Sequence, residues 1–158
     1  MNKISVRWPL LVITLLLLPI PSVPAAPTAP ATGESPHLSR VNYFQKQLPG
    51  DYVGMQNPLT SSREQQDQGQ RLFDGYCASC HGFGGVGKGI EGERLAVEPA
   101  QLPRAAQGVF PSDRDSYLYW TISEGGVPVH SPMPPFKDVL ASQQIWQIIL
   151  YINTIAYF

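Results

Sequence analysis

The most regular pattern of apolar positions lies at the C-terminal end of the chain. Apolar side chains recur there at the i, i+3, i+4 and i+7 spacing that places them on one face of an α-helix. The repeat consists of Ile145, Ile148, Ile149 and Ile152. It predicts a helix over residues 143–155 whose N-terminal cap is Ser142.

A second helical pattern precedes the middle of the chain. Ser61 and Glu64 have the S-x-x-E spacing of a capping box, which predicts a helix over residues 62–76. Its apolar stripe consists of Gly69, Leu72, Phe73 and Tyr76. Glycine inside a helix costs about 1 kcal/mol relative to alanine, so it needs a reason to be there. We therefore expect the C-terminal helix to cross closely at this point, near Gly69 and Phe73.

Loops and turn-forming residues separate the other elements. Residues 90–110 predict a loop, and its expected inward anchors are Leu95, Leu102, Val109 and Phe110. Ser112 or Asp113 then caps a third helix. This helix is expected to end at the glycine pair that starts at Gly125. Prolines stiffen residues 127–136 into an extended segment that cannot form an α-helix.

The composition indicates one domain preceded by a tail. With 158 residues, 43% hydrophobic and 15% charged, the chain can build one core but hardly two. Residues 26–60 are polar and proline-bearing without a sustained period, which predicts an extended proline-rich arm or linker. The domain itself is expected over residues 61–158.

Residues 1–25 have the form of an export signal. Lys3 and Arg7 precede an apolar run, and cleavage is expected after Ala25 or, as the alternative, after Ala31. The run is shorter than the roughly 20 residues that span a bilayer. We expect a periplasmic protein, with an uncleaved N-terminal membrane anchor as the other option.

The net charge excludes one class of partner. Eleven basic and twelve acidic residues give −1, and loss of two basic residues with the signal brings the charge to −3. Proteins that bind nucleic acid usually carry a basic footprint. We therefore expect no nucleic-acid partner.

The chemistry of the chain is concentrated in one pentapeptide. Cys77, Cys80 and His81 have the C-x-x-C-H spacing of covalent c-type haem attachment. Each thiol can add to one haem vinyl group, and the histidine then lies beneath the iron as an axial nitrogen ligand. The predicted cofactor is one covalently attached haem c with its iron.

Other interpretations of these cysteines are weaker. Tetrahedral zinc needs four ligands, and the chain has two cysteines and three histidines, one of them adjacent to Cys80. A thioredoxin-like pair would need a βαβ pattern, and a disulfide across so short a ring contributes little. The glycines of residues 82–89 imitate a dinucleotide or phosphate loop, but no strand precedes them and Gly89 replaces the required serine or threonine. We expect a flexible turn that passes close to the haem edge.

Met133 is the expected second axial ligand. It lies within the proline-stiffened segment, and a thioether opposite histidine suits haem iron and raises its reduction potential. His130, three residues away, and Met55, in the arm, are the competitors. The predicted metal ligands are thus His81 and Met133, and the cofactor-binding residues are these two with Cys77 and Cys80.

With these motifs the chain resembles class I (monohaem) bacterial periplasmic cytochromes c. The resemblance implies an all-α cytochrome c fold of three to five helices wrapped around one covalently bound haem, here with a loop-rich N-terminal arm. It also implies that a loop proline carbonyl, of Pro99 or Pro103, binds the other nitrogen of His81, which would set the ring tautomer. The arm lies outside the family pattern.

The resemblance implies an electron carrier and not an enzyme. The expected function is the periplasmic transfer of one electron at a time, within a respiratory chain, between redox protein partners: a donor dehydrogenase or quinol-oxidising complex and a terminal oxidase or reductase. The alternative is a haem-bearing subunit of a larger membrane or periplasmic oxidoreductase, docked through the N-terminal arm. A haem enzyme or ligand sensor with a displaceable sixth ligand is the third hypothesis.

Overall fold

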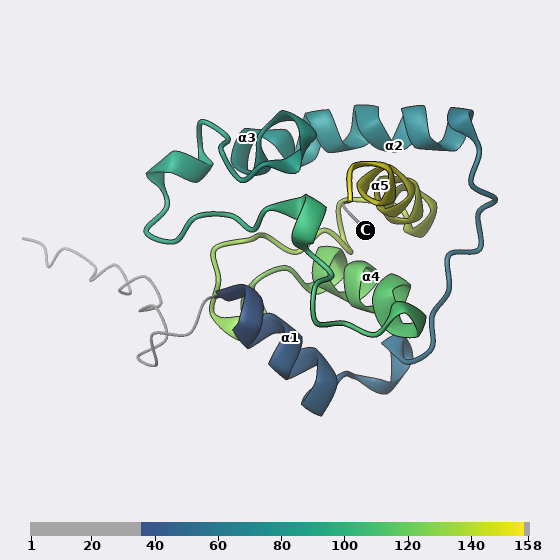
Figure 1. Cartoon of the computed structure of the whole chain (residues 1–158), viewed down its shortest axis with the longest axis horizontal. Helices are drawn as coiled ribbons and strands as arrows, with labels where there is room; N and C mark the ends of the chain where they lie inside the picture. Colours follow the sequence, from purple (N-terminus) through teal and green to yellow (C-terminus); the bar gives the residue numbers. More distant parts are fainter. Residues whose placement is uncertain (1–35, 157–158) are drawn as a thin grey trace, which may run out of the picture.

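The computed structural model describes residues 36–156, and within that range the regular structure is entirely helical. The α-helices are α1 (Pro36–Gln47), α2 (Arg63–Tyr76), α3 (Ala78–His81), α4 (Arg114–Glu124) and α5 (Ser142–Ile155). Short 3₁₀ turns are η1 (Gly50–Tyr52), η2 (Phe83–Gly85), η3 (Gly92–Arg94), η4 (Leu102–Arg104), η5 (Pro111–Asp113) and η6 (Val127–Val129). Helix α5 lies between α2 and α4, and α1 lies beyond α4 (Figure 1). The expected all-α class is confirmed.

The crossing of α2 and α5 is as close as the sequence predicts. A Cβ atom on Gly69 would lie 2.0 Å from the carbonyl oxygen of Gln147 in α5. One turn further on, the rings of Phe73 and Tyr151 are 5.2 Å apart between centroids. Helix α2 begins one residue later than expected, because its cap is Ser62, whose Oγ accepts the N–H of Gln65. The missing side chain at position 69 thus brings the two backbones into contact.

Helix α5 presents the predicted face to the core. Its four core isoleucines, Ile145, Ile148, Ile149 and Ile152, are all buried. The predicted cap is wrong, because the N-cap is Ala141 and Ser142 already belongs to the first turn. The side chain of Gln144 accepts the N–H of Ala141 in its place, while Ser142 Oγ accepts a hydrogen bond from Tyr119 Oη.

The N-terminal arm differs most from its prediction. Residues 36–47 form helix α1 instead of an extended segment, and both Val41 and Phe44 are buried in the core. The ring of Phe44 meets Tyr117 of α4 edge-on, with centroids 5.2 Å apart. The helix is short and buries few apolar side chains. Its sequence therefore shows no recognisable helical repeat of apolar residues. Once docked on α4, it is part of the same core.

The long loop before α4 follows its prediction except at one anchor. Leu95 and Leu102 are partly buried and Val109 is buried, but Phe110 is 69% exposed. Helix α4 starts after Asp113 and ends at Gly125, whose φ of 61° turns the chain away. Phe110 directly precedes the 3₁₀ turn η5 that leads into α4.

Residues 36–156 include no helix that is long and apolar enough to cross a membrane. The predicted signal segment, residues 1–25, and both of its cleavage sites lie outside the described residues.

Candidate functional site

The C-x-x-C-H motif folds into one helical turn at the end of α2. The N–H groups of Cys80 and His81 both donate to the carbonyl of Cys77, at 3.1 and 2.8 Å. Cys77 ends α2 and Cys80 follows three residues later, a spacing that puts both thiols on one side of the turn. Both cysteines are free thiols, so the disulfide interpretation finds no support in the geometry.

The glycine-rich segment binds this turn through its backbone. The N–H groups of Gly87, Gly89 and Glu91 donate to the carbonyls of His81, Cys80 and Ser79 respectively. These carbonyls end a helix and would otherwise lack partners. A Cβ atom on Gly89 would lie 2.3 Å from the Ser79 carbonyl oxygen, so only glycine permits the approach. The segment therefore supports the cysteine turn, and its bonded N–H groups do not form a phosphate loop.

His81 is oriented by a backbone carbonyl, but not by that of a proline. Its Nδ1 lies 3.1 Å from the carbonyl oxygen of Ala100, so the prediction of Pro99 or Pro103 is wrong. The Pro99 carbonyl faces Gly87 instead, where a Cβ atom would lie 2.7 Å from it. Burial lowers the pKa of His81, and the hydrogen bond to Ala100 opposes that effect. A proton on Nδ1 leaves the lone pair of Nε2 free to bind a metal.

Met133 lies on a loop that is closed by its own backbone. We call residues 125–136 the methionine strap. The N–H of Gly126 donates to the carbonyl of Met133 at 2.7 Å, and the N–H of Ser131 donates to the carbonyl of Gly126 at 3.0 Å. The strap begins with the 3₁₀ turn η6, which the sequence did not predict, and returns to α4 where the Phe136 N–H donates to the Ile122 carbonyl.

The four predicted site residues line one cavity of about 430 Å³. Cys77, Cys80, His81 and Met133 all contribute to its wall. The rest of the wall is largely apolar and includes Phe73, Leu118, Ile122, Phe136, Ile148 and Ile152. His130 is exposed and Met55 packs against the core elsewhere, and neither of these competitors lines the cavity.

The cavity wall carries a buried thiol and two basic side chains. Burial, reinforced by the proximity of Cys80, raises the pKa of Cys77 to about 12.

His37 and Arg40 of α1 also line the wall, and sequence reasoning missed both because α1 itself was not predicted. Within residues 36–156 no group of three or more histidine, cysteine or acidic side chains is placed so that it could hold a metal ion.

The family comparison agrees with this geometry. Residues 64–152 match the model of the family described as cytochrome c oxidase, cbb3-type, subunit III. The chain belongs to this family of cytochrome c domains. Such domains carry covalently bound haem c with its iron, and they serve haem-based electron transfer.

One solved structure supports the fold, and a second has a lower structural similarity. A chain of the Kuenenia stuttgartiensis reducing HAO-like protein complex Kustc0457/Kustc0458 is 19% identical, with a TM-score of 0.53, and the match covers 73% of this chain and 55% of that chain. Cytochrome CL from the marine methylotrophic bacterium Methylophaga aminisulfidivorans MPT is 24% identical, with a TM-score of 0.41, covering 73% and 66%. The chain thus covers less than two thirds of either structure. A search of curated proteins gives no match.

The residues of the cavity fit haem c. Two free thiols three residues apart can form two thioether bonds, and the apolar wall suits a porphyrin. A histidine with its Nδ1 hydrogen-bonded and a methionine on a separate loop are the two donors that a six-coordinate iron would require. The donor set therefore agrees with the cofactor of the family.

Proposed function

We propose that this chain is a periplasmic electron-transfer protein that passes one electron at a time through haem c, with His81 and Met133 as axial ligands. The observation that carries the proposal is that Cys77, Cys80, His81 and Met133 converge on one apolar cavity. When bound, haem c supplies an iron that cycles between its ferric and ferrous states.

The residues of the chain would suit that role in three ways. Cys77 and Cys80 attach the cofactor to the end of α2, which the Gly69 crossing fixes against α5. His81 offers Nε2 while Ala100 holds its ring, and Met133 offers its thioether sulfur from the strap. The apolar wall excludes water and favours the less charged, reduced state. Two strong donors leave no open position for a substrate, which favours electron transfer over catalysis at the iron.

Replacement of the methionine tests the ligation. Met133→Ala should convert the low-spin spectrum to a high-spin one, remove the weak long-wavelength iron–sulfur band and lower the reduction potential. Met55→Ala is the matched control, because Met55 lies outside the cavity, and it should leave the spectrum unchanged. An unchanged spectrum in Met133→Ala would show that another group is the sixth ligand. Rapid binding of carbon monoxide or cyanide by the unaltered protein would favour the enzyme or sensor hypothesis.

A second candidate is a haem-bearing subunit of a larger oxidoreductase complex. The observation that favours it is the family description, which names an oxidase subunit. One similar structure also comes from a multi-protein assembly, the reducing HAO-like protein complex Kustc0457/Kustc0458. Purification from the native source distinguishes the two roles: elution as a single small protein at high salt supports a free carrier, whereas co-elution with larger proteins supports a subunit.

Export is the remaining part of the proposal. It rests on the form of residues 1–25 and on the attachment of c-type haem outside the bacterial cytoplasm, where the oxidising compartment requires delivered, reduced thiols. Cell fractionation with N-terminal sequencing tests it. A mature N-terminus at Ala26, or at Thr32, in the periplasmic fraction is the expected result. Haem-loaded protein that stays in the membrane with residue 1 intact would indicate an uncleaved anchor.

A further inference from the structure

Helix α1 precedes the part of the chain that the family model matches, and one of its side chains reaches the methionine strap. We propose that Arg40 is a positioning residue for Met133. Its hydrogen bonds hold the strap in the closed conformation and thereby strengthen the bond between the methionine sulfur and the iron. The inference rests on the ligation proposed above. It adds a role for a segment outside the family-matched residues.

The guanidinium of Arg40 bridges two points of the strap. Its Nη1 donates to the carbonyl of Gly125 at 2.6 Å, where α4 ends and the strap begins. Its Nη2 donates to Ser131 Oγ at 3.3 Å. The same Oγ lies 3.5 Å from the N–H of Met133, which donates to it. A single side chain thus connects the start of the strap to the backbone of the proposed ligand.

The other end of this connection is fixed in the core. Val41 and Phe44, close to Arg40 along α1, are buried, and the guanidinium carbon lies 5.8 Å from the centre of the Trp120 ring. Further along the helix, Gln45 Nε2 donates to the Gly108 carbonyl at 3.0 Å. Because α1 is held at several points, the strap cannot swing away from the cavity without breaking the two arginine hydrogen bonds.

The burial of Arg40 indicates that the contact is specific. The residue is 7% exposed, and within residues 36–156 no carboxylate forms an ion pair with it. A buried charge is costly unless hydrogen bonds or an opposite charge compensate it. Here the strap supplies the acceptors, and bonds from a charged donor are among the stronger ones in proteins. Arg40 also lines the cavity wall, so its positive charge lies beside the cofactor site.

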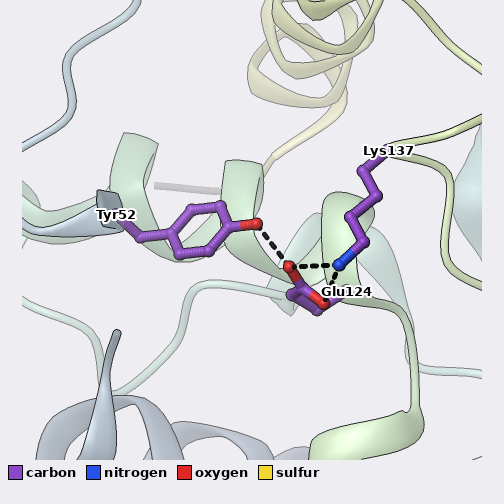
Figure 2. A network of polar contacts seen from close by, with 3 residues as sticks. All are labelled: Tyr52, Glu124 and Lys137. Carbon is purple, nitrogen blue, oxygen red and sulfur yellow. Dashed lines mark hydrogen bonds and ion pairs between the residues drawn. The ribbon is translucent and has the colours of Figure 1, made fainter. Parts of the chain in front are cut away.

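A second contact, from η1, holds the two ends of the strap together. Glu124 and Lys137 flank the strap on its two sides and form an ion pair at 3.0 Å. Tyr52 of η1 donates to the same carboxylate at 2.5 Å, and Figure 2 shows Tyr52 and Lys137 meeting Glu124 from opposite sides. Arg40 therefore acts on a loop whose ends are already closed, and its effect concentrates on residues 125–133.

The test measures how readily the strap opens in the ferric holoprotein. Cyanide binds the iron only when the methionine leaves, so its binding rate reports opening. In Arg40→Gln the rate should rise about tenfold or more, because hydrogen bonds from a charged group are among the stronger ones in proteins. The iron–sulfur band should weaken in parallel. Ser131→Ala, which keeps the arginine, should show a smaller change in the same direction.

Arg63→Gln is the matched control, since Arg63 is an exposed arginine at the start of α2, and its cyanide rate should equal that of the unaltered protein. A wild-type rate in Arg40→Gln would overturn the proposal, and if that variant does not fold, a wild-type rate in Ser131→Ala would overturn it instead. An altered pH dependence of the potential with an unchanged band would show that Arg40 acts on the haem carboxylates instead, which also overturns it. Met133→Ala separates the two claims, because an unchanged band there would refute the ligation itself.

Discussion

Gly69 of α2 lies against the backbone of Gln147 in α5 with no room for a methyl group between them. A Cβ atom at position 69 would come within 2.0 Å of the Gln147 carbonyl oxygen and 2.6 Å of its carbonyl carbon. The side chain of Gln147 turns back to α2, where its Nε2 donates to Gln65 Oε1 and Gln68 Oε1, both at 2.8 Å. The crossing that holds the cysteine turn thus combines a backbone contact with a buried amide.

Gly69→Ala should destabilise the holoprotein by about 3 kcal/mol or more, because the clash involves backbone that cannot move aside. Urea unfolding monitored by haem absorbance measures this. Gly75→Ala is the control in the same helix, since nothing lies within 4 Å of its added Cβ, and it should be neutral or stabilise by about 0.5 kcal/mol. Equal stability of the two variants would contradict the close crossing.

The glycine-rich segment gives a second matched pair. In Gly89→Ala the new Cβ would meet the carbonyl oxygens of Ser79 and Ala78, at 2.3 and 2.6 Å, so the support of the cysteine turn should be lost. We expect a loss of about 3 kcal/mol and a lower yield of haem-loaded protein. In Gly84→Ala the new Cβ would lie in open space. Only the positive φ of 73° is unfavourable for alanine, and it should cost about 1 kcal/mol. The unfolding free energies should rank in that order, and a reversed order would refute the packing role.

The network of Tyr52, Glu124 and Lys137 predicts a pH-dependent contribution to stability. The hydrogen bond from Tyr52 and then the charge of Lys137 lower the pKa of Glu124, while burial opposes them. Burial, followed by the bond to Glu124, raises the pKa of Tyr52, so the phenol remains protonated. A carboxyl group whose pKa is lowered in the folded state stabilises the fold. This contribution is fully present when the pH is above the ordinary glutamate pKa of about 4.3. This contribution is lost as the pH falls through the lowered pKa.

Tyr52→Phe removes the donor and should cost about 1 kcal/mol at pH 7, a value reduced for partial exposure of the pair. The difference from the unaltered protein should shrink as the solution is acidified below about pH 4. Denaturant titrations across that range provide the measurement. A difference that stays constant from pH 7 to pH 3 would show that the ionised carboxylate is not involved.

Helix α1 can be tested as part of the core. Phe44→Ala removes a buried ring that meets Tyr117 edge-on, and it should lower the free energy of unfolding by about 3 kcal/mol. Val53→Ala, at an exposed position in the same N-terminal segment, should change it by less than about 0.5 kcal/mol. If Phe44→Ala were as stable as Val53→Ala, the segment would be the detached arm that the sequence suggests.

The sequence identified those features whose signal is local. The isoleucine repeat specified α5, Gly69 marked the crossing, and the spacing of Cys77, Cys80 and His81 indicated the cofactor. The proline-stiffened segment favours Met133 over His130 and Met55, and the structure places Met133 alone of these three on the cavity wall. Each of these signals lies within a few residues, where helical period, capping and proline act.

Tertiary structure alone decided the partners of the site. The acceptor for His81 is a backbone carbonyl nineteen residues away, and every residue type carries one, so no sequence signal distinguishes Ala100 from its proline neighbours. Arg40 meets Gly125 across eighty-five residues, from a helix whose two core side chains are too few to form a recognisable period. The sequence by itself therefore determined the cofactor and the main helices, because these depend on local spacing. Only the packing of distant segments decided what orients the histidine and what holds the methionine strap.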